Sequence, residues 1–503
     1  MDRRTLTLAR PQLAADGLSF FRWGRVAGKV LVSNDAGDWT LLSESELDDL
    51  LGGRVSGGHP RFQELRDKNF LREGLDLDAF AARVARRNTH VRRGPHWHVV
   101  TLTTRCTQGC AYCRTTRQSG ENTGADLSAE NAEKVVDLAL QSSSASITFE
   151  LQAQGGEPLC NFDVLRHLVE VARARNERAA GKTLRFTLVS NLTAMTEAAA
   201  DWLIANDVLV CTSLDGPAGL HDANRKWKHG APHAEVIRWI EYFNRRYVDG
   251  GRDTGVWHVD AVMTTTRPTL TAWREVVDEY VARGLRTIQL RPLNPAVVSR
   301  EMWPVIGYSA DEYLDFYRRA LDYILQLNGQ GVEITERTAS TFLVRILTSE
   351  DPGIVDIQSP SGAGTAQIAY DVDGRVFPSN EARMVDAMGE PLFALGHVGD
   401  LTVADVLRHP TVRAIAAASL LDAQPMCADC WNKPFCGISP VLTFMTQGDL
   451  FGQRPRSLEC KEHMGVSGRL FELLAHEGDA RTAEILKRWT GSPVDRCAVS
   501  DAP

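Results

Sequence analysis

The N-terminal part of the chain has short stretches rich in apolar residues, separated by turn residues at Ala27-Gly28 and Asn34–Gly37. These stretches predict short strands at residues 20–26, 29–33 and 39–42. Ser43, followed three residues later by Glu46, forms a capping box and predicts the start of a helix. Strands followed by small helices favour a winged-helix-like module over residues 18–74, and helical spacing continues in a linker helix at 75–87.

The central part of the chain changes to alternating strands and helices. Strands are predicted at residues 99–104, 147–151, 184–190, 208–214, 256–263 and 287–291. Helices are predicted after the cap residue Ser128 and at residues 164–175, 197–205, 234–247 and 271–283. Six strands separated by helices indicate right-handed βα units and a parallel sheet, either open or curled into a partial barrel. In such folds the chemistry takes place at the C-terminal ends of the strands.

The last third of the chain follows a third pattern. A helix is predicted at 311–327, and two short strands at 367–370 and 375–377 flank an Asp-Gly turn that is typical of a hairpin. One helix is predicted at 403–420, just before a group of cysteines. Residues 491–503 have the composition of a disordered tail.

Composition limits the class of protein. The chain has 503 residues, 43% of them hydrophobic and 24% charged, which is typical of a soluble globular protein. The net charge of −8 gives no overall basic surface for nucleic acid, and no apolar run is long enough to span a membrane. Arg3 and Arg4 are not followed by the apolar stretch of an export signal, so we expect a cytoplasmic protein without nucleic-acid or membrane partners.

Three cysteines follow the first strand of the central region. Cys106, Cys110 and Cys113 lie in the segment Cys-Thr-Gln-Gly-Cys-Ala-Tyr-Cys. An iron–sulfur cube needs four ligands, so three cysteines leave one iron open to a substrate or cofactor. A zinc site would need a fourth Cys or His at close spacing, and the sequence has none there.

This spacing, Cys-x3-Cys-x2-Cys after the first strand of a βα domain, resembles the radical S-adenosylmethionine (SAM) superfamily. The resemblance implies a four-iron four-sulfur cluster whose open iron binds SAM. It also implies reductive cleavage of SAM to a 5′-deoxyadenosyl radical, which abstracts hydrogen from a carbon atom. Gly155-Gly156-Glu157-Pro158, after the second strand, is similar to the family motif that holds the methionyl amine of SAM.

Further residues at the strand ends match family positions. The resemblance assigns SAM contacts to Tyr112, Ser190, Asn191, Ser213, Arg225 and Arg291. Ser190, Asn191 and Arg225 are equally compatible with ordinary loop or surface positions. Asp215, in Ser-Leu-Asp-Gly-Pro at the end of the fourth strand, is the candidate catalytic residue because it faces the place where the radical forms. It also fits an ordinary turn residue before Gly216 and Pro217.

A second cysteine set lies near the C-terminus. Its members are Cys427, Cys430, Cys436 and Cys460. The set resembles the SPASM extension of radical SAM peptide maturases, which typically carries two auxiliary clusters. This chain has Ser379 and Pro440 where the family has cysteines of the first auxiliary cluster. We therefore expect two 4Fe-4S clusters in all, one binding SAM and one auxiliary, with a structural zinc site as the alternative for the C-terminal set.

The N-terminal module resembles peptide-recognition elements that pair with a leader peptide through a strand edge, although a purely packing role fits its pattern too. Together with the segments at 32–37 and 291–295, the chain is similar to the radical SAM maturase of the His-Xaa-Ser system. The implied function is modification of a ribosomally synthesised peptide or small protein by hydrogen abstraction, oxidation or crosslinking. The implied electron donor is a flavodoxin or ferredoxin. Two alternatives remain: formylglycine formation like that of anaerobic sulfatase maturases, and a non-catalytic iron–sulfur or zinc module that binds peptide.

The expected fold is α/β, a partial (β/α)6 radical SAM barrel between an N-terminal winged-helix-like peptide-recognition module and a C-terminal SPASM-like iron–sulfur extension. The expected divisions are an arm (1–17), the module (18–74), a linker helix and loop (75–96), the barrel (97–305), bridging helices (306–363), the auxiliary-cluster domain (364–465), a C-terminal helix (466–490) and the tail (491–503).

Overall fold

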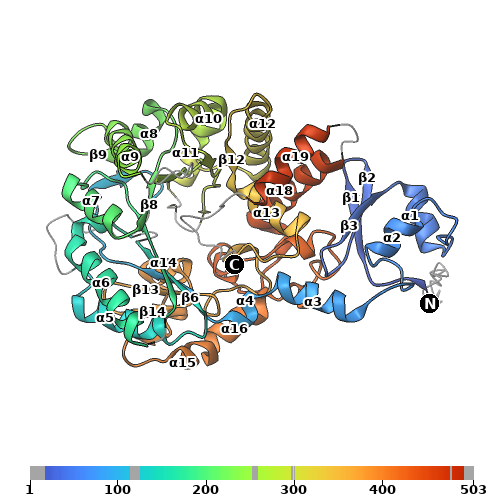
Figure 1. Cartoon of the computed structure of the whole chain (residues 1–503), viewed down its shortest axis with the longest axis horizontal. Coiled ribbons are helices and arrows are strands. Elements are labelled where there is room, and N and C mark those ends of the chain that lie inside the picture. Colours follow the sequence, from blue (N-terminus) through green and yellow to red (C-terminus); the bar gives the residue numbers. More distant parts are fainter. Residues whose placement is uncertain are drawn as a thin grey trace, which may run out of the picture.

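A computed structural model describes residues 17–113, 125–152, 155–179, 181–251, 259–295, 298, 301–475 and 479–491. The predicted arm and tail lie outside these residues apart from Gly17 and Gly491, and so does Cys497. Figure 1 shows a small N-terminal module beside a larger body in which helices surround a curved sheet. No described helix is long and apolar enough to cross a membrane.

The N-terminal module contains the three strands that the sequence predicts. They are β1 (Arg22–Val26), β2 (Lys29–Ser33) and β3 (Trp39–Leu42), in one antiparallel sheet. Its helices are α1 (Glu44–Leu51) and α2 (Phe62–Asp67), and α3 (Leu77–Arg87) and α4 (His90–Arg93) lead to the central region. The capping box of Ser43 and Glu46 is confirmed, since each side chain accepts a hydrogen bond from the backbone of the other.

Both faces of this small sheet are covered. Val30 and Val32 pack with α1 and α2 in a core of the module's own. Leu31, which points to the opposite face, belongs instead to the main core of the molecule together with Trp431 and Phe435. The sheet therefore has both faces buried, one by the module's own helices and the other against the C-terminal region.

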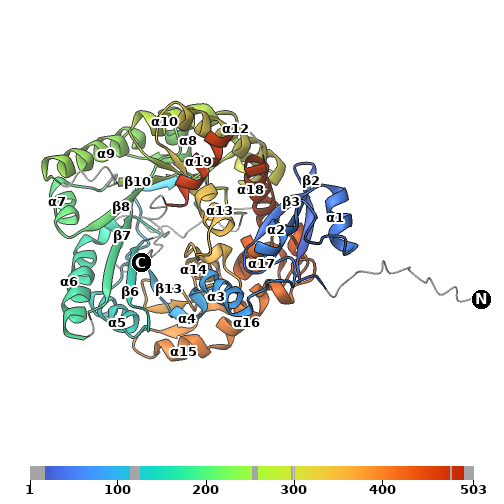
Figure 2. The ribbon, with the colours of Figure 1, turned by 45° about the vertical axis from the view of Figure 1, so that its right-hand side comes forward.

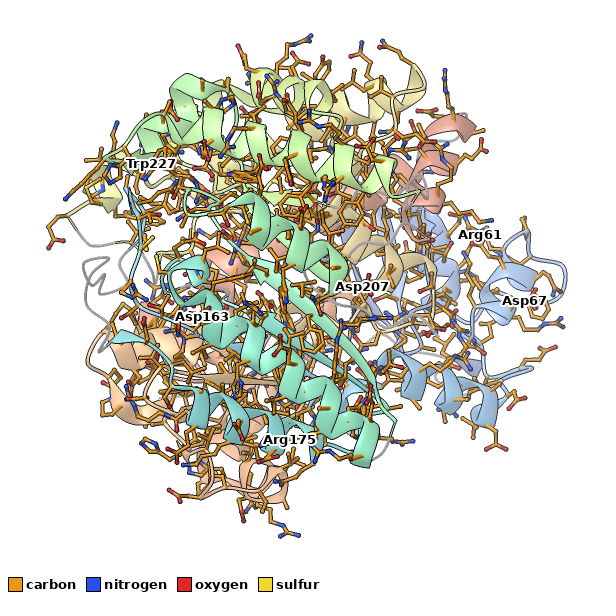
Figure 3. The ribbon with its side chains drawn as sticks, turned by 60° about the vertical axis from the view of Figure 1, so that its left-hand side comes forward. Arg61, Asp67, Asp163, Arg175, Asp207 and Trp227 are labelled. Carbon is orange, nitrogen blue, oxygen red and sulfur yellow. The ribbon has the colours of Figure 1, made fainter. Side chains whose placement is uncertain are left out.

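The central region forms the parallel sheet that the alternating pattern predicts. Its parallel strands are β4 (Trp97–Val100), β6 (Ser146–Leu151), β7 (Thr183–Val189), β8 (Val208–Ser213) and β10 (Val259–Val262). The helices between or after them are α5 (Ala129–Leu140), α6 (Phe162–Ala179), α7 (Glu197–Ala205), α8 (Ala218–Asn224), α9 (Pro232–Asp249) and α10 (Trp273–Ala282). These helices lie around the outside of the curved sheet in Figure 2, and in Figure 3 Asp163 and Arg175 mark α6 in front of the strands.

The sixth predicted strand does not join this sheet. β11 (Thr287–Ile288) pairs in parallel with β12 (Thr335–Glu336), not with β10. The chain that follows β11 is held by a side chain, since the buried carboxylate of Glu336 accepts a hydrogen bond from the backbone of Leu290. The expectation of six strands in one sheet is therefore corrected to five, which leaves the barrel partial.

The predicted C-terminal hairpin extends the same sheet at its other edge. β13 (Gln367–Tyr370) pairs in parallel with β4 and antiparallel with β14 (Arg375–Phe377), which pairs with β15 (Gly396–His397). The eight strands follow the order β10-β8-β7-β6-β4-β13-β14-β15. The barrel and the C-terminal region therefore share one sheet.

The remaining helices belong to the C-terminal part of the chain. They are α11 (Trp303–Ile306), α12 (Ala310–Gly329), α13 (Arg337–Leu347), α14 (Asn380–Ala387), α15 (Val403–Arg408), α16 (Pro410–Ser419), α17 (Pro440–Gln447), α18 (Leu458–Ala475) and α19 (Ala480–Trp489). The single helix predicted over 403–420 is wrong, because the chain leaves helical geometry at His409 before Pro410. Proline disfavours a helical conformation in the residue before it and starts a new helix well.

Candidate functional site

The first cysteine loop is fixed by a two-stranded sheet that the sequence did not reveal. β5 (Gln108–Cys110) pairs antiparallel with β9 (Arg225–Trp227), which places Cys110 directly opposite Arg225. The backbone of Ala111 also donates a hydrogen bond of 2.8 Å to the carbonyl of Asn224. The segment after the fourth barrel strand is thereby held against the cysteines. Trp227, labelled in Figure 3, marks the end of this pairing.

The three thiols of the loop gather at one place. Burial raises the pKa of Cys106 to about 12, the backbone N–H of Gln108 opposes that rise, and the nearby Cys110 and Cys113 add to it. Among the described residues, no three His, Cys, Asp or Glu side chains are arranged to hold a single metal ion.

Glu157 ties the second and third strand ends together. Its carboxylate accepts hydrogen bonds from the Ser190 hydroxyl at 2.6 Å and from the backbone N–H groups of Asn191 and Leu159 at 2.8 and 3.2 Å. Burial raises its pKa to about 7, and the same hydrogen bonds oppose that rise. The sequence assigned this carboxylate to an ammonium group, whereas here it is engaged with its own chain.

The glycines before Glu157 have a packing reason. A Cβ atom on Gly156 would lie 2.4 Å from the carbonyl oxygen of Thr103 and 2.5 Å from that of Arg105. Only glycine allows this approach to the strand end that leads into Cys106. Gly155 has a positive φ of 139°, a conformation that other residues rarely adopt.

Asn191 reaches from the third strand end to the cysteine loop. Its side-chain nitrogen lies 3.7 Å from the sulfur of Cys106 and 3.3 Å from the hydroxyl oxygen of Thr107. The predicted residues Ser190 and Asn191 therefore lie at the same place as the first cysteine and the Gly-Gly-Glu loop.

A second group of predicted residues meets around Asp215. Its buried carboxylate accepts hydrogen bonds from the Tyr112 hydroxyl at 2.9 Å and from Arg225 at 3.1 and 3.2 Å. The side chain of Asn224 and the backbone of Thr264 donate to it as well. The Arg225 guanidinium also lies 5.3 Å from the centre of the Tyr112 ring.

Charge pairing dominates this second group. Burial alone would raise the pKa of Asp215, but Arg225 and the hydrogen bonds hold it below its ordinary value. The pKa of Arg225 is raised well above its ordinary value because Asp215, Tyr112 and Cys110 together outweigh burial. Both groups are therefore charged, and each fixes the orientation of the other.

The other two predicted site residues lie apart from these networks. Ser213 is half-buried at the end of β8, where it pairs with Val262. Arg291 follows β11 and lines a cavity inside the sheet. One charged pair close to the cysteines was missed: Arg105 binds Asp126 at 2.6 and 2.8 Å and also donates to the carbonyl of Cys160. In the sequence, the only indication of this pair was that Arg105 directly precedes Cys106.

The C-terminal cysteines also come together. Cys427, Cys430 and Cys436 lie on the loop between α16 and α17, and Cys460 lies in the first turn of α18. Burial raises the pKa of Cys436, and the other three thiols are close enough to raise it further. Burial raises the pKa of Cys430. This rise is opposed by the backbone N–H groups of Asn432 and Lys433 and by the Arg22 guanidinium. Groups that favour thiolates are what a cluster needs around its ligands.

Two neighbours of this cysteine set were missed. Nδ1 of His463 lies 3.6 Å from the sulfur of Cys436, and the sulfur of Met464 lies 3.8 Å from that of Cys430. His463 follows Cys460 by three residues on one helix, and this spacing was a usable signal because such residues share a face.

The two positions where the family has further cysteines are helix starts in this chain. Ser379 caps α14 by accepting a hydrogen bond of 3.2 Å from the backbone of Ala382. Pro440 is the first residue of α17, whose cap is Ser439. Serine is a favoured helix cap and proline a favoured first helical residue, so both residue types suit these positions.

A cavity of about 330 Å³ lies between the barrel and the C-terminal region. The inner face of the sheet lines it with Val99, Glu150 and Val262, and α14 and α18 line it with side chains that include Glu381 and His463. Burial and the nearby Glu381 carboxylate raise the pKa of Asp356 on its wall, and Arg291 opposes that rise. Burial also raises the pKa of Glu462 to about 7.

An outer groove of about 830 Å³ continues this cavity. The same residues, Pro295, Leu442, Leu458 and Glu459, line both spaces. The groove runs along α17 and the loop before α18, past Thr446 and Gln453. The groove and the cavity therefore adjoin each other beside α17 and α18.

Comparison with known protein families is decisive at this point. Residues 100–264 match the model of the Radical SAM superfamily. The chain contains a radical SAM domain. The matched range begins at the end of β4 and ends after β10, so it includes both networks around the first cysteine loop.

Curated relatives match parts of the chain. A cysteine-type anaerobic sulfatase-maturating enzyme of Clostridium perfringens is 26% identical over 286 residues, 55% of this chain and 69% of that protein. An uncharacterized protein of Methanocaldococcus jannaschii is 23% identical over 198 residues, 39% of this chain. That match spans 62% of the archaeal protein, less than two thirds of its length.

Solved structures with bound S-adenosylmethionine share the fold. The structure of anSMEcpe with bound AdoMet superposes with a TM-score of 0.63 at 18% identity, covering 78% of this chain and 99% of that one. Streptococcus suis SuiB bound to S-adenosylmethionine superposes with a TM-score of 0.53 at 13% identity, covering 88% of this chain and 99% of that one. At these identities the likeness establishes the architecture around the radical SAM domain.

Proposed function

We propose that this protein is a radical SAM enzyme that modifies a ribosomally synthesised peptide or small protein. The observation that carries this proposal is the meeting of three thiols with the Glu157 and Asp215 networks at the C-terminal ends of the barrel strands. A cluster bound there would supply the electron that splits SAM, and the resulting radical would abstract hydrogen from the substrate. The electron would come from a donor such as flavodoxin or ferredoxin.

Separate sets of residues are proposed to bind the first cluster and SAM. Cys106, Cys110 and Cys113 would hold the first cluster and leave one iron to SAM. The residues assigned to SAM are Tyr112, Gly155, Gly156, Glu157, Ser190, Asn191, Ser213, Arg225 and Arg291. Arg225 has the strongest physical case, because a buried guanidinium opposite Cys110 is a natural partner for a carboxylate.

Asp215 acts in this scheme as a positioning residue. Its oxygens are occupied by Tyr112, Asn224, Arg225 and Thr264. A carboxylate so fully engaged holds Arg225 and Tyr112 in place and leaves little capacity to act on the substrate. This assignment replaces the catalytic role that the sequence pattern favoured.

The C-terminal cysteines would hold an auxiliary cluster that relays electrons. Four cysteines fill all four iron corners, so none is left for a peptide. His463 both lines the cavity and lies next to Cys436, so its side chain adjoins the cavity and the cysteine set. A structural zinc ion remains the alternative for this set.

The substrate would reach the barrel through the groove and cavity. The N-terminal module would bind its leader segment, and the target residue would enter the cavity between barrel and C-terminal region. The finer assignment, a peptide of the His-Xaa-Ser type, is supported by the sequence resemblance alone. The peptide-bound structure of SuiB with its precursor SuiA has the same overall fold, with a TM-score of 0.52.

The test is anaerobic reduction with SAM. Replacing Cys106, Cys110 and Cys113 by alanine together should abolish 5′-deoxyadenosine formation and leave the C-terminal cluster in place. Chromatography measures the first outcome, and iron content with electron paramagnetic resonance (EPR) measures the second. Continued SAM cleavage in the triple variant would refute the ligand assignment, and a wild-type protein that never cleaves SAM would favour a non-catalytic module.

A second candidate function is formylglycine formation, which is favoured by the similarity to the clostridial sulfatase-maturating enzyme. Mass measurement of the treated substrate distinguishes the two. Oxidation of a serine removes two hydrogens and leaves a new aldehyde, and oxidation of a cysteine also removes the sulfur. A crosslink removes two hydrogens without forming an aldehyde, so a hydrazine reagent separates these outcomes.

A further inference from the structure

The N-terminal module makes direct contact with the loop that carries three of the C-terminal cysteines. Nε of Arg22 on β1 donates to the carbonyl of Ala428, between Cys427 and Cys430, at 2.5 Å. The hydroxyl of Ser33 on β2 donates to the carbonyl of Trp431 at 2.7 Å. These groups come from residues about 400 positions apart in sequence.

Arg87 at the end of α3 makes a third contact of the same kind. It donates to the carbonyl of Pro434 at 2.7 Å, and to the carbonyls of Arg345 and Thr348 at 2.8 and 2.9 Å. Its side chain is only 1% exposed and lies 5.7 Å from the centre of the Phe435 ring. The loop therefore has carbonyl groups bound by the module after each of its first two cysteines, and by Arg87 of the linker helix before the third.

Charge and shape support the same interface. Lys433 of the loop binds Asp35 of the module at 2.7 Å, and Arg22 binds the same carboxylate at 3.0 Å. A Cβ atom on Gly24 would lie 2.2 Å from the Trp431 ring, so β1 packs directly on the residue after Cys430. Figure 1 shows the module seated against the C-terminal part of the chain.

A short cysteine loop has no regular hydrogen-bond ladder to hold it. Between Cys427 and Cys436 the only regular structure is one turn of 3₁₀-helix, Lys433–Phe435. Turns within the loop bind the carbonyls of Cys427, Cys430 and Lys433. Three further carbonyls are bound from outside the loop, two by the N-terminal module and one by Arg87 of the linker helix.

We propose that the N-terminal module is part of the binding site of the C-terminal metal centre. Arg22, Ser33 and Arg87 are positioning residues that hold the loop so that Cys427, Cys430 and Cys436 face one centre. The proposal rests on the proposed function only in taking these cysteines as metal ligands. It makes the module more than a peptide-binding attachment, because losing its contacts removes the metal.

The experiment uses the Cys106→Ala, Cys110→Ala, Cys113→Ala protein, in which all bound metal belongs to the C-terminal set. Arg22→Met and Ser33→Ala are introduced singly and together, and iron, zinc and sulfide are measured per chain with EPR of the reduced protein. We expect about four irons in the parent and less than about one in the double variant. Arg25→Met is the matched control, since Arg25 is an exposed arginine on the same strand that pairs only within the module, with Glu44.

A second measurement separates loss of metal from loss of fold. With Cys106, Cys110 and Cys113 intact, Arg22→Met with Ser33→Ala should lower the iron content from about eight to about four and still form 5′-deoxyadenosine. Metal content and EPR equal to those of the parent would overturn the proposal. A parent triple variant without iron or zinc would overturn the metal assignment itself, and with it the proposal.

Discussion

At the residue scale, the pair Asp215 and Arg225 shows how burial gives a charge a fixed orientation. Arg225 is 7% exposed and Asp215 is fully buried, so water contributes little to stabilising either charge. Each charge is stable only because the other is present, and removing one partner leaves an unpaired buried ion. The pair therefore holds Arg225 rigidly beside the cysteine loop.

We expect Asp215→Asn to lower the free energy of unfolding by about 3–5 kcal/mol, because it leaves Arg225 charged and unpaired. We also expect a raised KM for SAM with a smaller effect on the rate at saturation. Thermal unfolding and 5′-deoxyadenosine kinetics measure the two effects. Glu44→Gln, which breaks an exposed pair with Arg25, is the control and should change neither. Full SAM affinity and stability in Asp215→Asn would mean that Asp215 is an ordinary turn residue.

The raised pKa of Glu157 predicts that the stability of the protein depends on pH. Its pKa of about 7 in the folded protein, raised by burial, exceeds the ordinary value of 4.5. The folded protein therefore holds a proton that the unfolded chain releases between about pH 4.5 and 7, and this contribution to stability is lost as pH rises through that window. Relative to Glu157→Gln, the SAM-free wild type should lose about 3 kcal/mol of stability between pH 4.5 and 7.5. Parallel unfolding curves for both proteins across this range would contradict the assignment.

At the scale of elements, two positions at which the sequence resemblance implies cluster ligands lie at helix N-termini in this chain. Ser379 lies where the family has a cysteine, and its hydroxyl caps α14. The first residue of that helix is buried, as is Arg383 one turn later, so protein side chains occupy this region. The position at which the sequence resemblance implies a cluster ligand is here the cap of a helix.

We expect Ser379→Ala to lower the free energy of unfolding by about 1 kcal/mol through loss of the cap. Ser379→Cys should leave the iron content at about eight per chain, since a single cysteine cannot bind a further cube. Denaturant unfolding and iron analysis test these outcomes. An iron content near twelve in the wild type or in Ser379→Cys would show that a further auxiliary cluster exists.

At the scale of the whole molecule, the N-terminal module is packed on both faces of its sheet. Its own helices cover one face, and Trp431 and Phe435 cover the other. Trp39 extends the contact, because its ring lies 4.9 Å from Phe471 and its N–H donates to the carbonyl of Ile346. A region that the sequence divides off by a linker is thus bound to the C-terminal core.

Deleting residues 18–74 should weaken binding of the precursor peptide and leave SAM cleavage without peptide largely intact. The first effect follows from the proposed role of the module. The second follows because the first cysteine loop pairs with β9, which lies on the opposite side of the molecule from the module in Figure 1. Titration calorimetry with the peptide and 5′-deoxyadenosine assays measure them. Unchanged peptide affinity in the deletion would refute peptide recognition by the module.

The sequence by itself determined the features that depend on neighbouring residues. The capping boxes, the Asp-Gly hairpin and the strand–helix alternation all arise from local hydrogen bonds and periodic burial, which a one-dimensional pattern records. The cysteine spacing and the Gly-Gly-Glu-Pro loop pointed to the radical SAM domain for the same reason. The expected helix over 403–420 failed locally, where Pro410 divides it.

Only the tertiary structure decided which distant segments meet. Examples are the strand pairs β5 with β9, β11 with β12 and β13 with β4. Strands pair through backbone N–H and C=O groups, which do not differ between residue types, so the sequence does not record which strands pair. Periodicity shows that a face is buried but not what covers it. The contacts of Ser33 with Trp431 and of Arg22 with Ala428 therefore had no signature in the pattern, because each depends on how the whole chain folds back on itself.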